Sequence, residues 1–333
     1  MPLAAAFPLL INQVTKAYDK HIAACSEPSN DFGESSDKAI KDLANDLAQA
    51  FYDYILQGNV QAVITTLPGI LPVLGDKRKL RLPLVGTTAT PGIGAGYGMI
   101  FDSDGLSTVL GVAYAALPWV DPPGAVLENL AKALEDALLK KRDDGAKDGA
   151  DPDAIINAFA WSVAEALHDL GGKIYVAVPF IMGPQLTGPI MTPTGPSTPA
   201  LFPIEPGVAI SFKQGLIPTG LIGLKLKLPA LQLAIVAAYQ AELKAGSADG
   251  ADWSAVDQAL GMQIATAAHT FFVGTLVHLD SFHFGSIAIP VPPPIVLLPP
   301  PPRPCAPWPM MMPYGNFFIG PKSDSGTGIG MTI

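Results

Sequence analysis

Charged side chains are scarce in this chain. Only 15% of its 333 residues are Asp, Glu, Lys or Arg, against about 25% in typical soluble domains. The net charge is −9, and the longest basic runs are the short Lys77–Lys79 and Lys140–Arg142. A nucleic-acid partner is not expected, because such partners are bound by dense positive patches. Scarce charge also predicts much apolar surface that is buried in a core or against partner chains.

The chain also lacks long apolar runs and grouped cysteines. Its first residues, MPLAAAFPLLINQ, have no basic region of the kind that begins a secretion signal. The most apolar window, Leu216–Tyr239, contains two lysines and two prolines, so we expect no membrane span. Cys25 and Cys305 match no metal or redox spacing. We interpret them as two isolated thiols, and a disulfide between them stays open.

Motifs for catalysis and metal binding are missing as well. His278 and His283 flank Asp280, but strand alternation places 278 and 280 on one face and 283 on the other. The sequence FDSDG at 101–105 resembles the start of a calcium loop, without its later ligands or the Glu at its twelfth position. We predict no catalytic residues, no metal and no cofactor.

What the chain does contain is an internal repeat. Three eight-residue segments align without gaps: LANDLAQA from Leu43, FAWSVAEA from Phe159 and LGMQIATA from Leu260. Their apolar residues recur at a helical spacing. Each segment follows an acidic stretch and an earlier helical pattern, and each precedes a β-like run. Small residues at matched positions predict close helix packing, and we expect helix N-caps at Asp37, Asp153 and Asp252 or Ser254.

The stretch VGTTATPGIGAGYGMI, residues 85–100, has glycines at alternate positions. A dinucleotide fingerprint would need a third glycine at position 97, where Tyr97 stands, and a helix directly after it. A phosphate site is therefore not predicted. Alternating glycines instead let an extended backbone lie against another backbone. GTGIGMTI near the end of the chain has a similar pattern of alternating glycines, and PGVAISF from Pro206 is a diverged counterpart.

Residues 285–333 hold 13 of the 34 prolines and three charged side chains. Polyproline favours an extended conformation and cannot build a sheet interior. Disordered linkers are usually polar, whereas this segment is rich in Ile, Val, Leu, Met, Phe and Trp. We expect it to lie on another surface, most simply a neighbouring subunit; a ligand for an SH3-type domain is the rival interpretation.

The repeat resembles units found in virion structural proteins of tailed bacteriophages, especially contractile-tailed ones. The likeness rests on the Ala-x-Ala helix, the aromatic pair Tyr52 and Tyr54, Gly58-x-Val60, the VITT strand and the terminal Gly-x-Gly. The second and third copies lack the tyrosine pair and the Thr-Thr strand. The resemblance implies a particle component and no catalytic residues.

Together these patterns predict an α+β fold. We expect three tandem repeats of helix-loop-helix plus short β-strands, over residues 1–104, 105–212 and 213–289, and a Pro-rich extended arm over 290–333. The residues expected to mediate assembly are Pro292, Pro293, Pro294, Pro300, Trp308, Tyr314, Phe317, Phe318, Gly92, Gly94, Gly96 and Gly98.

The predicted function is that of a non-catalytic structural subunit, most simply in the tail, baseplate or neck of a phage particle. Its expected partners are other subunits of that particle, with homo-oligomerisation, and its expected location is the virion, after assembly in the host cytoplasm. Two alternatives stay open. One is a membrane-active or cell-surface binding protein, suggested by the low charge and by GLIPTGLIGLKLKLPAL. The other is an enzyme with a site between repeats.

Overall fold

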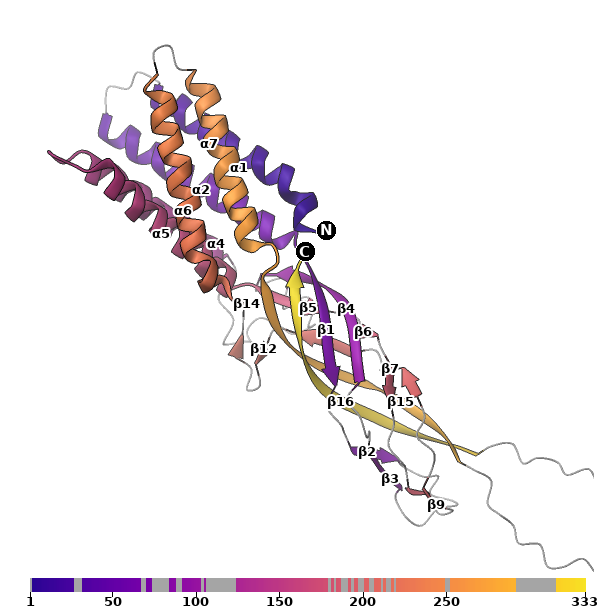
Figure 1. The fold of residues 1–333 in the computed structure, drawn as a ribbon. Coiled ribbons are helices and arrows are strands. Elements are labelled where there is room, and N and C mark those ends of the chain that lie inside the picture. The colour runs from indigo at the N-terminus through magenta and orange to yellow at the C-terminus, as the bar shows by residue number, and fades with distance from the viewer. Residues whose placement is uncertain are drawn as a thin grey trace, which may run out of the picture.

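Helices and strands occupy opposite ends of the molecule (Figure 1). The computed structural model describes residues 2–26, 32–66, 70–73, 84–87, 92–102, 105, 124–178, 181–182, 184–186, 191–192, 195–196, 201–203, 207–210, 212–213, 217–218, 220–248, 252–291 and 316–333. The predicted α+β class is confirmed, since helices and an antiparallel sheet both contribute to the fold.

The helices come in pairs along the chain, and each pair is followed by strands of the main sheet. The bounds of the helices are α1 (Leu3–Ser26), α2 (Phe32–Leu56), α4 (Ala125–Gly145), α5 (Pro152–Gly172), α6 (Leu224–Gly246) and α7 (Trp253–Phe272). The main strands are β1 (Asn59–Thr66), β4 (Gly92–Phe101), β5 (Tyr175–Val178), β11 (Gly207–Ile210), β15 (Leu276–Val291) and β16 (Asn316–Thr332).

Shorter strands lie between these elements. Two of them join the main sheet, β6 (Ile181–Met182) against β4 and β14 (Leu221–Ile222) against β15. The others form two-stranded pairs: β2 (Ile70–Val73) with β3 (Leu84–Thr87), β7 (Pro184–Leu186) with β10 (Leu201–Pro203), β8 (Met191–Thr192) with β9 (Gly195–Pro196), and β12 (Phe212–Lys213) with β13 (Ile217–Pro218).

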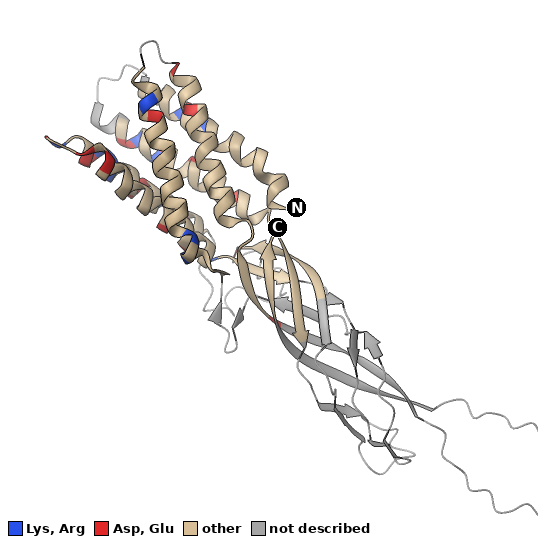
Figure 2. Ribbon diagram, in the orientation of Figure 1, with Lys and Arg blue, Asp and Glu red and all other residues tan. Residues whose placement is uncertain are grey.

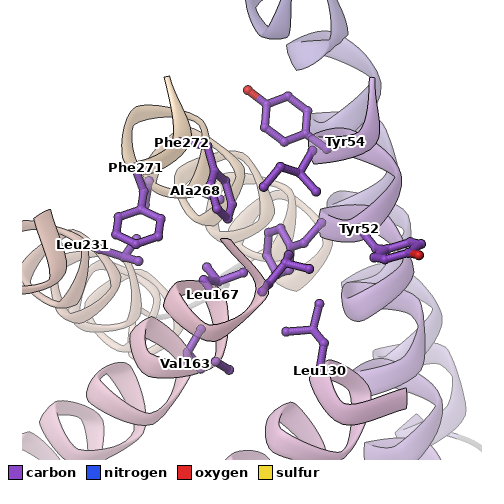
Figure 3. Packing of buried hydrophobic residues seen from close by; sticks show 14 of the residues in the cluster. Tyr52, Tyr54, Leu130, Val163, Leu167, Leu231, Ala268, Phe271 and Phe272 are labelled. Atoms are coloured by element: carbon purple, nitrogen blue, oxygen red, sulfur yellow. The ribbon is translucent and has the colours of Figure 1, made fainter. Parts of the chain in front are cut away.

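The six described helices form a ring in which each helix packs on the next. The neighbours are α1 and α2, α2 and α4, α4 and α5, α5 and α6, α6 and α7, and α7 again with α1. Buried side chains from all six helices meet in one hydrophobic cluster that continues into the sheet. Figure 3 shows part of this cluster, with Tyr54, Leu167, Leu231 and Phe272 among its members.

Small residues on α2, α5 and α7 allow this close packing, as their matched positions predicted. A Cβ at Gly261 of α7 would lie 2.9 Å from the Cα of Thr15 on α1, so that only glycine fits there without a shift. The other five small residues are alanines with no exposed surface at all: Ala44, Ala48, Ala160, Ala164 and Ala265.

The main sheet closes on itself. Its strands run in the order β1-β16-β15-β11-β5-β4, and β1 pairs with both β16 and β4. Side chains of β1 alternate between the two faces, as a strand requires. Val60, Ala62 and Ile64 have no exposed surface, whereas Val63 is 53% exposed. The sheet therefore has an inner face filled by small and β-branched side chains and an outer face open to solvent.

Hydrogen bonds made by the last residues of the chain connect the sheet to the helices. The hydroxyl of Thr332, a residue that is 1% exposed, donates a hydrogen bond to the carbonyl oxygen of Phe272 at 2.6 Å and accepts one from the Thr275 amide at 2.9 Å. The amide of Leu3 donates to the carbonyl oxygen of Ile333 at 2.5 Å. The first helix and the last strand thus meet where the two ends of the molecule join.

Two details differ from the sequence-based expectations. The predicted N-cap Asp252 is present on α7, where its carboxylate accepts hydrogen bonds from the amides of Ser254 and Ala255. The prediction of Asp153 was wrong, because Asp151 caps α5 and accepts from the Asp153 amide. Asp37 lies inside α2, which begins earlier, at Phe32.

The second difference concerns the predicted arm over residues 290–333. Its last part is not a separate arm: Asn316–Thr332 forms β16, which pairs with β15 along the whole of that strand and with β1. This part contains a single proline and several glycines, so its amides are free to join a sheet, whereas the preceding polyproline lacks the amide donors that a sheet needs.

Candidate functional site

The four glycines of the GIGAGYGMI stretch lie in β4, directly beside β1. Gly92, Gly94, Gly96 and Gly98 stand opposite Thr66, Ile64, Ala62 and Val60 in antiparallel register. This part of β4 is therefore paired inside the chain. A neighbouring protein would meet it through its outer side chains and not through a free backbone edge.

Steric demand explains glycine at position 98. A Cβ on Gly98 would come within 2.8 Å of Val178 Cγ2 and 2.9 Å of the Ala177 carbonyl oxygen, both in β5. Two glycines of β16 make room for β1: a Cβ on Gly328 would overlap the Val63 carbonyl oxygen, and one on Gly330 would overlap the Val60 side chain. These three glycines thus leave room for atoms of neighbouring strands.

Large apolar side chains gather on the opposite, outer face. We call this surface the outer sheet face; it spans β4, β1, β16 and the start of β15. Ile329 stands opposite Val63, and Met331 stands opposite both Gln61 and Leu276. Their exposed fractions range from 66% for Tyr97 to 41% for Leu276. The apolar members of the face are Val63, Tyr97, Met99, Leu276, Ile329 and Met331.

Charge is nearly absent from the described part of the sheet. In Figure 2 the coloured acidic and basic residues lie on the helices, and the described strands are almost entirely tan. Asp280, next to the outer sheet face, is 7% exposed, and its carboxylate lies 3.2 Å from Nε2 of His278. The helices, in contrast, carry exposed ion pairs such as Lys20 with Asp46 at 2.7 Å. An exposed apolar surface with so little charge is typical of a contact surface.

A second feature is a polar cluster inside the helix ring. The hydroxyls of Tyr18 on α1 and Tyr239 on α6 are hydrogen-bonded at 2.8 Å, and both side chains are buried. Nζ of Lys141 on α4 lies 3.8 Å from the centre of the Tyr239 ring, a cation–π contact. Burial raises the pKa of both tyrosines and lowers that of Lys141.

Acidic groups complete this cluster. Burial raises the pKa of Glu242 and of Asp257, and Oδ2 of Asp257 has no hydrogen-bond partner among the described residues. A cavity of about 260 Å³ adjoins Lys141, Tyr239 and Glu242. These contacts join α1, α4 and α6, so the cluster is a polar cross-link between these three helices.

A third feature is a polar contact that joins α2 and α7 near the sheet. The Tyr54 hydroxyl and Nδ1 of His269 are 2.5 Å apart, and the Phe7 ring stacks on the imidazole at 4.3 Å between centroids. Burial lowers the pKa of His269, so the ring is neutral at neutral pH, and its tautomer decides which of the two groups donates the hydrogen bond. Like the Tyr18–Tyr239 contact, it ties helices that are far apart in sequence.

Within the ranges that the structure describes, no three His, Cys, Asp or Glu side chains are grouped closely enough to hold a metal ion. Of the FDSDG sequence, the structure describes Phe101, Asp102 and Gly105. Asp102 accepts hydrogen bonds from the Gly105 amide at 2.8 Å and from the Tyr52 hydroxyl at 2.7 Å. Across the same residues, none of the helices combines the length and apolar content that crossing a membrane requires.

Of the remaining predicted assembly residues, two lie in the described part of the chain and six lie outside it. Phe317 and Phe318 lie in β16, opposite Pro290 and Ile289 of β15. The others lie outside the described residues: Pro292, Pro293, Pro294, Pro300, Trp308 and Tyr314.

Comparison of the chain with models of known protein families, with curated proteins and with solved structures gives no match. The function is therefore argued from the chain's own residues.

The residues of the outer sheet face were missed at the sequence level, although a signal for them exists. In GIGAGYGMI, Tyr97 and Met99 flank Gly98, so they alternate with the glycines. Strand alternation places these residues on the face opposite the glycines. The sequence interpretation considered only the glycines, whereas Tyr97 and Met99 provide the part of the outer sheet face that belongs to β4.

Proposed function

We propose that this chain is a non-catalytic structural subunit of a larger assembly, and that the outer sheet face is the surface on which neighbouring subunits dock. The observation that carries the proposal is a continuous, exposed and nearly uncharged surface across four paired strands. Each of its half-exposed side chains would contribute on the order of 1 kcal/mol when covered. Because the backbone beneath is paired within the chain, the contact is made by side chains.

We further propose that the chain consists of three copies of one unit. Each unit would hold two helices and two strands: α1, α2, β1 and β4, then α4, α5, β5 and β11, then α6, α7, β15 and β16. The recurring element order supports this division, as does the antiparallel pairing of the two strands within each unit. The third unit would then include β16, and the Pro-rich segment would be the connection between its two strands.

The particle we favour is a bacteriophage virion, for which the support is the sequence resemblance. The chain would be a tail, baseplate or neck component, and other subunits of the particle, including further copies of the chain, would be its partners. The Pro-rich segment would supply a further contact. The low charge of the sheet suits a surface that is covered in the assembled particle.

Charge placed on the outer sheet face tests the proposal. We expect the wild-type chain to form a defined oligomer in sedimentation velocity, and the double substitution Tyr97→Lys with Ile329→Lys to shift it toward the 34.7 kDa monomer. The cause is that a covered lysine would lose its hydration. The matched control is Leu9→Lys with Leu243→Lys, which adds the same charge at exposed leucines of α1 and α6 and should leave the oligomer intact.

Two outcomes would count against the proposal. One is equal association of the outer-face variant and the control variant. The other is a wild-type monomer that binds neutral lipid vesicles through this face, which would favour the membrane-active alternative.

A further inference from the structure

A long apolar groove runs between α6 and α7 on the outside of the helix ring. Its volume is about 590 Å³. The buried side chains of Leu231, Ala267 and Phe271 form the floor, and the exposed Ala234 and Met262 stand at its sides. The alanines keep the walls low, so the floor remains accessible from outside. We call this feature the α6/α7 groove.

Lys227 ends the groove on the side of the sheet. Its Nζ donates hydrogen bonds to the carbonyl oxygens of Phe271 at 3.1 Å and Val273 at 2.7 Å, and to the Thr275 hydroxyl at 3.2 Å. The ammonium group is thus engaged at the C-terminal end of α7, where a cation is favoured. No other side chain among those that line the groove is charged, so the groove suits an uncharged, apolar occupant.

The groove between α1 and α2 provides an internal comparison. Five of its seven lining residues are polar or charged, and the ion pair between Lys20 and Asp46, at 2.7 Å, bridges the two helices across it. An open apolar groove is therefore not a general consequence of pairing two helices in this ring. Exposed leucines also directly precede two residues that line the α6/α7 groove: Leu226, 88% exposed, precedes Lys227, and Leu233, 65% exposed, precedes Ala234.

The chain itself contains a segment of matching chemistry. Residues 292–315 connect β15 to β16 and lie outside the described residues; by sequence they comprise 24 residues, 11 of them proline, with Arg303 as the single charge. The aliphatic run IVLL, Trp308 and three consecutive methionines provide apolar side chains. Proline-rich peptides lose little conformational entropy on binding and are commonly held in apolar or aromatic grooves.

The length of residues 292–315 decides whether this segment can reach the groove of its own chain or only that of another copy. The middle of a 24-residue connection lies about 12 residues from either end, at most about 43 Å away at ~3.6 Å per residue. β15 has 16 residues, so the connection begins about 50 Å from the start of that strand at ~3.3 Å per residue. The groove lies beyond that start, in the helical end (Figure 1). The segment cannot reach the groove of its own chain.

We propose that the α6/α7 groove binds residues 292–315 of a second copy of this chain. This inference rests on the proposed structural function and names one of the contacts. The strand tip of one copy then meets the helical end of the next, so the copies join head to tail. Such a contact is heterologous, and it produces rings or open chains of copies.

The segment contains Cys305, which allows a direct test by disulfide trapping. In a Cys25→Ser background, which removes the exposed thiol on α1, Thr266→Cys places a thiol on an exposed wall of the groove. The matched control is Ala158→Cys, at an exposed position on α5. Full-length proteins are oxidised with copper phenanthroline and separated by non-reducing electrophoresis.

We expect the Thr266→Cys protein to form covalent dimers and longer chains, linked between position 266 and Cys305 in peptide mapping, and the Ala158→Cys control to remain largely monomeric. Adding Ala234→Glu, which puts a charge into the groove at an exposed helical position, should abolish the linkage. Equal linkage in the Thr266→Cys protein and the control would overturn the inference. A 266–305 link within one chain would also overturn it.

The two proposals fail separately. If lysines on the outer sheet face dissociate the wild-type oligomer while trapping at position 266 stays at the control level, the groove inference fails and the proposed function stands. If trapping succeeds while those lysines have no effect, the outer sheet face is not the docking surface, and the groove contact stands.

Discussion

At the scale of single residues, glycine allows strands of the sheet to pack closely. Val60 and Ile64 of β1 point inward with no exposed surface. Gly328 and Gly330 of β16 leave room for them, because a Cβ at either position would overlap atoms of β1. Gly98 of β4 leaves room for β5 in the same way, so glycine at these three positions is explained by packing within the chain.

This steric role predicts a loss of stability on adding one methyl group. Gly98→Ala should destabilise the fold by about 1–3 kcal/mol, the usual cost of overpacking a tight interior, and thermal denaturation would show it as a lower Tm. Ala95→Val is the control, since position 95 lies on the exposed face of the same strand and Val favours strands. Equal Tm values for Gly98→Ala and the wild type would refute the steric explanation.

Residue-level patterns predicted some of this and not the rest. They identified the glycine stretch as extended backbone lying against backbone, and the small helix residues as packing positions. They did not identify the partner of the glycines, because β1 and β16 are separated by most of the chain and no local signal pairs them. The N-cap of α5 was misplaced by two residues, since Asp151 and Asp153 are both acidic and flank the same proline.

At the scale of secondary-structure elements, polar contacts tie the helix ring together at a few points. The Tyr54–His269 contact joins α2 to α7, and it depends on an imidazole whose pKa is lowered by burial. Burial also lowers the pKa of His21, which contacts the Ala39 carbonyl oxygen at 3.1 Å and so joins α1 to α2. In both cases folding favours the neutral ring.

The sign of the pH dependence follows from these directions. Stability from a neutral histidine is complete above the ordinary pKa of about 6.5 and declines as the pH falls toward the lowered pKa of the folded state, because the unfolded chain binds the proton more readily. We therefore expect the urea concentration at the unfolding midpoint of the wild type to decrease when the pH is lowered from about 7.5 to about 5, a range that spans the ordinary histidine pKa.

His269→Gln should flatten this pH dependence, although it also lowers stability at neutral pH by weakening the contact with Tyr54. His168→Gln is the control, because His168 lies near the end of α5 with a partly exposed side chain, and its substitution should leave the slope unchanged. An unchanged slope in the His269→Gln protein would show that this contact does not sense pH.

Helix pairs were the most predictable elements, and strand pairing was the least. Apolar residues at helical spacing and glycines at the helix ends indicated α2, α5 and α7 directly. The predicted arm was wrong over residues 316–333, because β16 obtains its stability from β15 and β1, distant parts of the chain that a local pattern cannot reveal.

At the scale of the whole molecule, charge and shape are unevenly distributed. The helical end carries the described ion pairs of lysine and arginine and the polar cluster, while the described sheet exposes apolar side chains with little charge (Figure 2). A protein that acted alone would leave this surface in contact with water at a free-energy cost. The arrangement supports the proposal that neighbours cover the sheet.

The most direct test of this central claim is oxidation of Met99 and Met331, which lie on the outer sheet face and are 49% and 43% exposed in the single chain. Hydrogen peroxide is applied to the assembled wild type and to the dissociated Tyr97→Lys, Ile329→Lys variant, with the urea-unfolded chain as reference, and each methionine is followed by mass spectrometry. If neighbours cover the sheet, both methionines react several-fold more slowly in the assembly than in the dissociated variant. Equal rates in the two samples, or a wild-type chain that remains a monomer with both methionines reactive, would contradict it.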